Sequence, residues 1–331
     1  MKKCIDEDLT DEITKNGSRL YELEYRLKSP IKYIKDLARI IREGRYDIVH
    51  AHGNSCTLAI EMLAAKMENI KIRIAHSHNT SSKYKIAHMI LRKTFDKNYT
   101  YGLACSREAG KWLFKEAPFT VLKNGIDSKK YIFNKRIREE YRKKLDLENC
   151  KVIGHVGSFN YQKNHTFLIE IFKELYEIDS TYRLICVGDG ALRKEIEDNI
   201  KNYGLDGAVL FTGKTKDVPQ LMQAMDLFVM PSRYEGLPLT LIEAQAAGLP
   251  CFVSDLITNE VNITNLVNFI SLNNSAKEWA KIIHDHVMFD RDLLKNDVVS
   301  KISQEGYDIR ENAKKLKEIY MDLISGENNT L

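Results

Sequence analysis

The chain has 331 residues, 44% of them hydrophobic and 29% charged, with a net charge of +4, and this length fits two domains of about 150 residues each. The composition is typical of a soluble globular protein. No stretch approaches the roughly 18 apolar residues of a membrane-spanning helix, and the first residues turn acidic where a secretory signal would turn apolar. Six cysteines without a Cys-x-x-Cys pair argue against a disulfide framework and a structural zinc site, so we expect reduced thiols in a cytoplasmic protein.

Short β-branched runs alternate with amphipathic segments along the chain. Strands are predicted at 46–50, 71–76, 101–105, 120–122, 151–156, 182–187, 208–212, 227–230, 251–254 and 268–272, and helical patterns lie between them, as at 30–43 and 165–178. This alternation predicts parallel sheets covered on both faces. The expected fold class is therefore α/β, with two doubly wound, Rossmann-like domains and ligand sites at the carboxyl ends of their strands, in the cleft between them.

The charged stretch 129–148 is the predicted linker, which gives a first domain at 1–148 and a second at 149–331. Residues 1–150 contain 31 Lys and Arg against 20 Asp and Glu, and the remaining residues contain 19 against 26. A basic half predicts an anionic partner, either nucleic acid or phospholipid. Segment 83–97 is the best candidate for lipid binding, with Ile86, Met89 and Ile90 at helical spacing. We expect no nucleic acid, because no basic motif is interleaved with aromatic residues. The alternative is a solvated, lysine-rich surface.

The strongest chemical pattern is PSRYEGLPLTLIE at 231–243, which follows a predicted strand and enters a helical pattern. Pro238 suits a first helical turn, where its missing N–H would have no partner. The backbone N–H groups of Leu237, Leu239 and Thr240 would then form an anion site. Two carboxylates, Glu235 and Glu243, are suited to accept hydrogen bonds from sugar hydroxyls. The alternative is that Glu235 only caps the helix and that Glu243 is a solvated surface residue.

The stretch SRYEGLPLTLIEAQAAGLP at 232–250, with its two glutamates eight positions apart, resembles the signature of retaining glycosyltransferases of the GT-B fold. The similar group is the family 4 type, which makes capsular polysaccharides and exopolysaccharides. Other stretches match in chain order, namely DIVHAHG (47–53), RIAHSHNT (73–80), ACSREAG (104–110), LKNGID (122–127), GHVGSFNYQKNH (154–165), LICVGDG (184–190) and LFTGKTKDV (210–218). The resemblance covers nearly the whole chain from about residue 45.

The resemblance implies a role for individual residues. Lys163, in the turn that contains Gly157 and Ser158, matches the lysine that neutralises the donor diphosphate, and the segment from Gly236 to Thr240 matches the helix start beside it. Glu243 matches the glutamate that holds the nucleotide ribose, and Glu235 matches the one that contacts the transferred sugar. His78 matches a histidine that faces the donor sugar from the opposite domain. Lys163, Glu235 and His78 are thus the expected catalytic residues.

The histidines His50, His52, His76 and His78 fall at the ends of two predicted strands and could bind a metal. We expect none, because no carboxylate shares the segment and enzymes of this fold typically need no metal. The resemblance also implies that the last helix, about 309–324, crosses back to the first domain.

Two departures from the family pattern stand out. Ser158 occupies a position where many relatives have an arginine, so Lys163 would act with less help. In addition, only about 45 residues precede DIVHAH, and SRLYELEY at 18–25 resembles the third strand of the family. The first strand and its glycine-rich turn are therefore expected to be absent from an incomplete first domain.

These features predict transfer of a sugar from a UDP- or GDP-sugar to a saccharide or lipid-linked acceptor with retention of configuration, at or near the inner face of the plasma membrane. Two alternatives remain open. A chain without a working acceptor site would be a nucleotide-sugar-binding pseudoenzyme, and a sugar-nucleotide epimerase could use the same two-domain plan.

Overall fold

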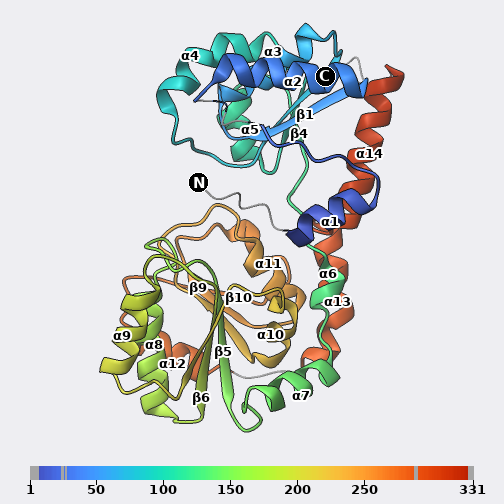
Figure 1. The fold of residues 1–331 in the computed structure, drawn as a ribbon. Helices are drawn as coiled ribbons and strands as arrows, with labels where there is room; N and C mark the ends of the chain where they lie inside the picture. Colours follow the sequence, from blue (N-terminus) through green and yellow to red (C-terminus); the bar gives the residue numbers. More distant parts are fainter. Residues whose placement is uncertain (1–6, 24–25, 27, 287–289, 327–331) are drawn as a thin grey trace. The chain divides into compact units, whose positions relative to one another are not determined.

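The computed structural model describes residues 7–23, 26, 28–286 and 290–326 and divides them into two compact units (Figure 1). Unit 1 contains the described residues up to Val121 and from Ile319 onward, and unit 2 contains Leu122–Glu318. None of the described helices is both long and apolar enough to span a lipid bilayer.

Unit 1 is a parallel sheet of four strands in the order β1-β2-β3-β4. Its elements in chain order are α1 (Glu7–Lys15), α2 (Pro30–Gly44), β1 (Ile48–Gly53), η1 (Cys56–Leu58), α3 (Ala59–Met67), β2 (Ile72–Ser77), α4 (Lys85–Asp96), β3 (Tyr101–Ala104), α5 (Arg107–Phe114) and β4 (Thr120–Val121). Side chains alternate between the faces of each strand. Val49 and Ala51 of β1 pack against helices α2 to α5, so His50 and His52 lie on the opposite face.

Unit 2 has a six-stranded parallel sheet in the order β10-β9-β8-β5-β6-β7. Its elements are α6 (Ser128–Tyr131), α7 (Lys135–Lys144), β5 (Lys151–Val156), α8 (His165–Ile178), β6 (Tyr182–Val187), α9 (Arg193–Asn202), β7 (Val209–Gly213), α10 (Val218–Ala224), β8 (Leu227–Met230), α11 (Leu239–Ala246), β9 (Cys251–Ser254), η2 (Asn259–Val261), β10 (Val267–Ile270), α12 (Ala276–His284) and α13 (Arg291–Gln304). The final helix, α14 (Ile309–Ser325), begins in unit 2 and ends in unit 1.

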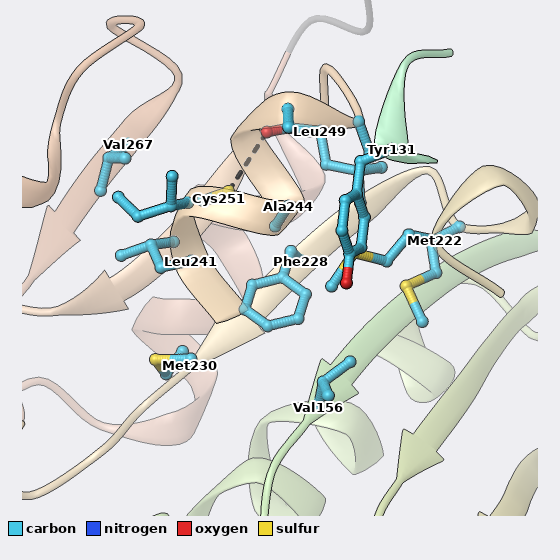
Figure 2. Close-up of a cluster of buried hydrophobic side chains, with 14 of the residues drawn as sticks. Tyr131, Val156, Met222, Phe228, Met230, Leu241, Ala244, Leu249, Cys251 and Val267 are labelled. Atoms are coloured by element: carbon cyan, nitrogen blue, oxygen red, sulfur yellow. Dashed lines mark hydrogen bonds between the residues drawn. The ribbon is translucent and has the colours of Figure 1, made fainter. Parts of the chain in front are cut away.

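Two buried clusters cover the two faces of the unit 2 sheet. One joins the sheet to α8, α9 and α12, and the other joins it to α10, α11 and α13. Figure 2 shows the second cluster, in which Phe228 of β8 lies among Tyr131, Met222 and Leu241. Phe228 and Leu241 are fully buried. The near-continuous apolar strands of this half are therefore covered on both sides, as the sequence predicts.

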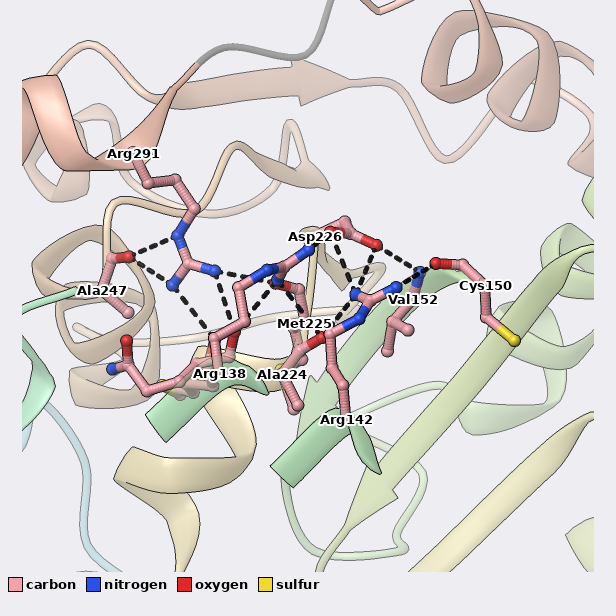
Figure 3. Close-up of polar contacts among 11 residues, drawn as sticks. Arg138, Arg142, Cys150, Val152, Ala224, Met225, Asp226, Ala247 and Arg291 are labelled. Carbon is pink, nitrogen blue, oxygen red and sulfur yellow. Dashed lines mark hydrogen bonds and ion pairs between the residues drawn. The ribbon is translucent and has the colours of Figure 1, made fainter. Parts of the chain in front are cut away.

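The predicted linker at 129–148 is folded and packs within unit 2. Arg138 and Arg142 of α7 both pair with Asp226, which precedes β8 (Figure 3). Arg138 also donates to the carbonyls of Gln223 and Met225. The chain thus divides after Val121, whereas the sequence predicts a boundary near residue 148. Helix α7 is held to unit 2 by these charged contacts, and Tyr141, Leu145 and Leu147 also pack against the core of that unit.

Arg291, the first residue of α13, closes the same network (Figure 3). Its side chain is 6% exposed, and burial lowers the pKa of its guanidinium to about 9. It donates hydrogen bonds to backbone carbonyls that belong to Met222, Gln223, Met225 and Ala247. One buried cation therefore satisfies the carbonyl ends of both α10 and α11.

One further expectation fails. The segment 18–25 was expected to form a strand, but its described residues, 18–23, have no regular secondary structure, and residues 24 and 25 lie outside the described residues. Within the part of the chain that the structure describes, β1 pairs with β2 alone and is an edge strand.

Candidate active site

The candidate site of unit 2 lies where the strand order reverses. The central strand β5 has β6 on one side and β8 on the other, so the chain leaves β5 and β8 in opposite directions along the sheet. A crevice opens at the carboxyl ends of the strands at such a switch point. Lys163 follows β5, while Glu235 and Glu243 follow β8. The topology alone therefore brings the predicted residues of the two loops to one edge.

The turn after β5 is shaped by close backbone contacts. A Cβ atom at Gly157 would lie 3.1 Å from the side chains of both His155 and Lys163. Gly188, after β6, has a φ of +130°, and a Cβ atom there would lie only 2.1 Å from the Gly157 carbonyl oxygen. Ser158 is exposed in this turn. Only glycine at 188 allows the two turns to approach this closely.

The loops after β5 and β8 are braced against each other. Arg233 N–H donates to the Gln162 carbonyl at 2.8 Å, and the Asn164 side-chain amide donates to the Pro231 carbonyl at 3.0 Å. Asn164 has a φ of 56°, a left-handed conformation that asparagine tolerates. These contacts fix the positions of the two predicted catalytic residues, which the loops carry.

Lys163 and Glu235 form an ion pair, with Nζ and Oε1 2.8 Å apart. Both side chains are largely buried, 14% and 7% exposed. The Gln162 side-chain amide donates to the other carboxylate oxygen of Glu235 at 2.9 Å. Glu235 therefore does not cap α11, which was the alternative left open by the sequence. It is the anionic partner of a buried lysine.

Helix α11 begins at Leu239, so Pro238 stands at its N-cap and not inside the first turn, and Gly236 and Leu237 precede the cap. The first N–H groups of a helix have no carbonyl partner within it. Leu239 and Thr240 supply two such groups, and the buried Thr240 hydroxyl has no hydrogen-bond partner among the described residues. A group that accepts hydrogen bonds, such as a phosphate, fits this end of the helix.

Glu243 lies one turn inside α11 and is half-buried, which overturns the alternative of a solvated surface residue. Burial raises the pKa of its carboxyl group, and a hydrogen bond from Tyr131 opposes that shift. Burial, together with the Glu243 charge, raises the pKa of the Tyr131 hydroxyl. Tyr131 lies in α6, far away in sequence, and was not predicted. Gln162 was also missed, although it stands next to Lys163.

The histidines of unit 1 form one cluster on the face of β1 and β2 that is opposite to α2–α5. His52 and His76 are register partners in the sheet, and His78 follows directly after β2. His52 Nδ1 and His78 Nε2 are 2.8 Å apart. Burial, and then the nearby His52 and His78, lower the pKa of His50 to about 3. The predicted clustering of the four histidines is therefore confirmed, with His78 in unit 1 and the other predicted site residues in unit 2.

Comparisons with known proteins agree with this architecture. Residues 5–130 match the family model described as Glycosyltransferase Family 4, and residues 137–296 match Glycosyl transferases group 1. EpsF of Bacillus subtilis (strain 168), named as a glycosyltransferase, is 34% identical over 94% of this chain and 84% of its own length. A UDP-Gal:alpha-D-GlcNAc-diphosphoundecaprenol alpha-1,3-galactosyltransferase of Escherichia coli is 28% identical over 89% of this chain and 80% of its own length.

Two solved structures have the same fold. Anabaena Alr3699/HepE in complex with UDP-glucose superposes with a TM-score of 0.74 at 19% identity, covering 95% of this chain and 88% of that one. A glycosyltransferase from Rickettsia africae ESF-5 gives a TM-score of 0.75 at 18% identity, covering 97% and 88%. With two Rossmann-like units and these relatives, the chain belongs to the GT-B glycosyltransferases, in the family of Glycosyltransferase Family 4 and Glycosyl transferases group 1 proteins.

Proposed function

We propose that this glycosyltransferase moves a sugar from a UDP- or GDP-sugar to a saccharide or lipid-linked acceptor, with retention of configuration, during synthesis of a cell-surface polysaccharide. The observation that carries the proposal is the buried Lys163–Glu235 pair beside the start of α11. This pair places an ammonium group that can bind a diphosphate next to a carboxylate that can accept hydrogen bonds from sugar hydroxyls.

The proposed donor site follows from these contacts. The turn of Gly157 and Ser158, Lys163, and the helix start from Gly236 through Leu237 and Pro238 to Leu239 and Thr240 bind the diphosphate. Glu243, which is oriented by Tyr131, accepts hydrogen bonds from the ribose. A bound diphosphate would attract Lys163 and leave Glu235 to accept hydrogen bonds from the sugar.

Positive charge placed where the leaving diphosphate gains negative charge lowers the barrier to transfer. Lys163 and the start of α11 supply this charge, so the proposed step uses no metal ion at the diphosphate. His78 of unit 1 would face the transferred sugar. Retention and the identity of the base are part of the proposal.

The relatives support the substrate classes. The Escherichia coli relative is named for a UDP-galactose donor and a diphosphoundecaprenol-linked acceptor. A capsular polysaccharide biosynthesis glycosyltransferase, CapH of Staphylococcus aureus, is 26% identical over 95% of this chain. These names favour a lipid-linked or saccharide acceptor over the epimerase alternative.

Replacement of Lys163 tests the donor site. Lys163→Ala should lower the rate of sugar transfer by about 100- to 1,000-fold, the usual loss when one group that stabilises transition-state charge is removed. The mutant should also bind UDP or GDP more weakly in calorimetry. Lys173→Ala is the matched control, because Lys173 lies in α8 of the same unit, where it pairs with the exposed Glu177 in the next turn and lies over the Tyr203 ring.

Two outcomes would count against the assignment. Equal nucleotide affinity in Lys163→Ala and wild type would show that Lys163 does not meet the diphosphate. Tight nucleotide binding by wild type without any transfer to lipid-linked or saccharide acceptors would favour the pseudoenzyme.

We further propose that α4 contacts an anionic membrane surface, at the cytoplasmic side. Ile86, Met89 and Ile90 are 70%, 67% and 73% exposed on one face of the helix, whereas Phe95 on the other face is buried in the core of unit 1. Exposed lysines flank this apolar face, namely Lys83, Lys85, Lys93 and Lys97. An apolar strip with flanking cations suits the interface of an anionic bilayer.

Vesicle sedimentation tests this surface. Binding should rise with phosphatidylglycerol content, fall with salt, and drop several-fold in Ile86→Gln/Ile90→Gln. The control is Leu293→Gln, which removes an apolar side chain that is 81% exposed on α13. Salt-insensitive binding, or equal losses in both variants, would leave α4 as a solvated surface.

A further inference from the structure

The histidine cluster of unit 1 contains three residues, His50, His52 and His76, to which the proposed function gives no role. Its four imidazoles form two close pairs, with His50 Nε2 and His76 Nδ1 3.2 Å apart, and His52 Nδ1 and His78 Nε2 2.8 Å apart. The pairs lie against each other, because the ring centroids of His50 and His52 are 4.2 Å apart and those of His76 and His78 are 4.1 Å apart. The first two rings are stacked, and the second two are tilted by 34°.

Three of these rings are spaced like the ligands of one metal ion. His50, His52 and His76 each offer a ring nitrogen, and the three nitrogens lie within 4.8 Å of one another. In a tetrahedral zinc site with Zn–N bonds of about 2.0–2.1 Å, two bound nitrogens are roughly 3.3 Å apart. The His50–His76 separation of 3.2 Å already has this value. The nitrogens of the three rings lie within 4.8 Å of one another, so the imidazoles would turn about their side-chain bonds to converge on one ion.

A further contact prepares His50 as a ligand. Its other ring nitrogen, Nδ1, lies 2.6 Å from the Tyr320 hydroxyl of α14. Metal-binding histidines usually make such a hydrogen bond with the nitrogen that does not bind the metal, which fixes the tautomer and the ring orientation. With the proton on Nδ1, the lone pair of Nε2 points toward His76.

We propose that His50, His52 and His76 bind one divalent transition-metal ion of the zinc class, with the fourth position taken by water or by His78. Imidazole ligands favour zinc, cobalt, nickel and copper, while magnesium and calcium prefer oxygen. The ion would join the ends of β1 and β2 and, through Tyr320, the end of α14. This site lies in unit 1 and is separate from the metal-free diphosphate step proposed for unit 2.

Titration of the full chain tests the site. After removal of metals by chelation, calorimetry should show one Zn²⁺ per chain and no binding of Mg²⁺, and Co²⁺ should give the visible absorption bands of a tetrahedral complex. His50→Gln and His76→Gln should each weaken Zn²⁺ binding at least tenfold. The control is His88→Gln, because His88 lies in the same unit beside Cys56 and should leave the affinity unchanged.

Several results would overturn the proposal. Wild type that binds no stoichiometric Zn²⁺ would contradict the site. Zn²⁺ binding that survives both cluster mutations but falls in His88→Gln would place the ion at Cys56. If a cluster variant fails to fold, modification of wild type by diethyl pyrocarbonate decides. Zn²⁺ should protect the exposed His52 but not His284 of α12, and equal modification of His52 with and without Zn²⁺ contradicts the site.

Discussion

The two units place their polar side chains at the same kind of sheet edge but hold them in different ways. In unit 2, Lys163 and Glu235 lie in loops after β5 and β8, and these loops are tied together by hydrogen bonds to backbone carbonyls, one from the Arg233 N–H and one from the Asn164 side-chain amide. In unit 1, His50 and His52 lie within the strand β1 itself, and their imidazoles make hydrogen bonds with other side chains.

The difference between the units follows from topology. Unit 2 has a reversal of strand order at β5 and β8, which opens a crevice between two loops. The described sheet of unit 1 runs in sequence order, with β1 at its edge. Hydrogen bonds between the loops suit the proposed diphosphate site, which needs fixed positions, whereas imidazoles in contact with one another suit the proposed metal site, where an ion would replace a proton. In each of the following experiments the test substitution changes unit 2 and leaves unit 1 unchanged for comparison.

The largest effect is expected from Arg291→Met, which removes the buried cation that satisfies four carbonyls of unit 2. Several buried acceptors left without a donor should cost about 3 kcal/mol or more in the free energy of unfolding. Chemical denaturation should show the loss in unit 2. Arg39→Met is the control, since Arg39 of α2 is 63% exposed and should change stability by less than about 0.5 kcal/mol. Equal losses in both units would mean that the two unfold together.

The next effect is local to the turns of the proposed donor site. Gly188→Ala would force a Cβ atom toward the Gly157 carbonyl at a φ of +130°, so we expect a loss of about 1–3 kcal/mol in stability together with weaker nucleotide binding. Gly207→Ala is the matched control, because it has no atom within 4 Å of the added Cβ and no positive φ. Nucleotide affinity that is equal in the two variants would show that the turns do not need this close approach.

The smallest effect concerns Glu243 and depends on pH. Burial raises the pKa of the Glu243 carboxyl in the folded state. Its contribution to the free energy of unfolding is therefore fully present below the pKa of the unfolded state, about 4.3. This contribution is lost as pH rises through the higher pKa of the folded state. Glu243→Gln keeps a hydrogen-bond acceptor for Tyr131 but carries no charge.

The Glu243→Gln variant should therefore match wild type in stability near pH 4 and exceed it by up to about 1 kcal/mol at pH 7–8, while it binds nucleotide more weakly. Urea denaturation at several pH values measures the difference. A variant that is less stable than wild type at pH 8 would show that the charged carboxylate stabilises the fold, as for a surface ion pair.

The sequence predicted the parts of the fold that depend on apolar patterning. The strands Lys151–Val156 and Leu227–Met230 begin and end where predicted, because buried parallel strands are continuous apolar runs with polar residues at each end. The placement of Lys163 and Glu235 at one edge of the unit 2 sheet could be predicted too, because both residues follow strands whose carboxyl ends lie at that edge.

Contacts that depend on three-dimensional neighbours could not be predicted. Tyr131 reaches Glu243 from a four-residue helix, and no periodicity marks so short an element. The sequence of helix α7, KRIREEYRKK, has almost no apolar residues and therefore predicts a linker. The helix is held largely by Arg138 and Arg142 on Asp226, with Tyr141 packed against the core, and ion pairs leave no hydrophobic pattern in a sequence.

The path of α14 has a consequence for how this protein can be divided. The chain passes between the units twice, after Val121 and again after Glu318, and within unit 2 Ile126 is hydrogen-bonded to Tyr307 and Ile309. A single proteolytic cut at either crossing would leave the two units covalently joined. A gene fragment that is to encode unit 1 must likewise carry two separate coding segments, so an exchange of this unit between relatives requires the codons up to Val121 and those from Ile319 onward to be replaced together.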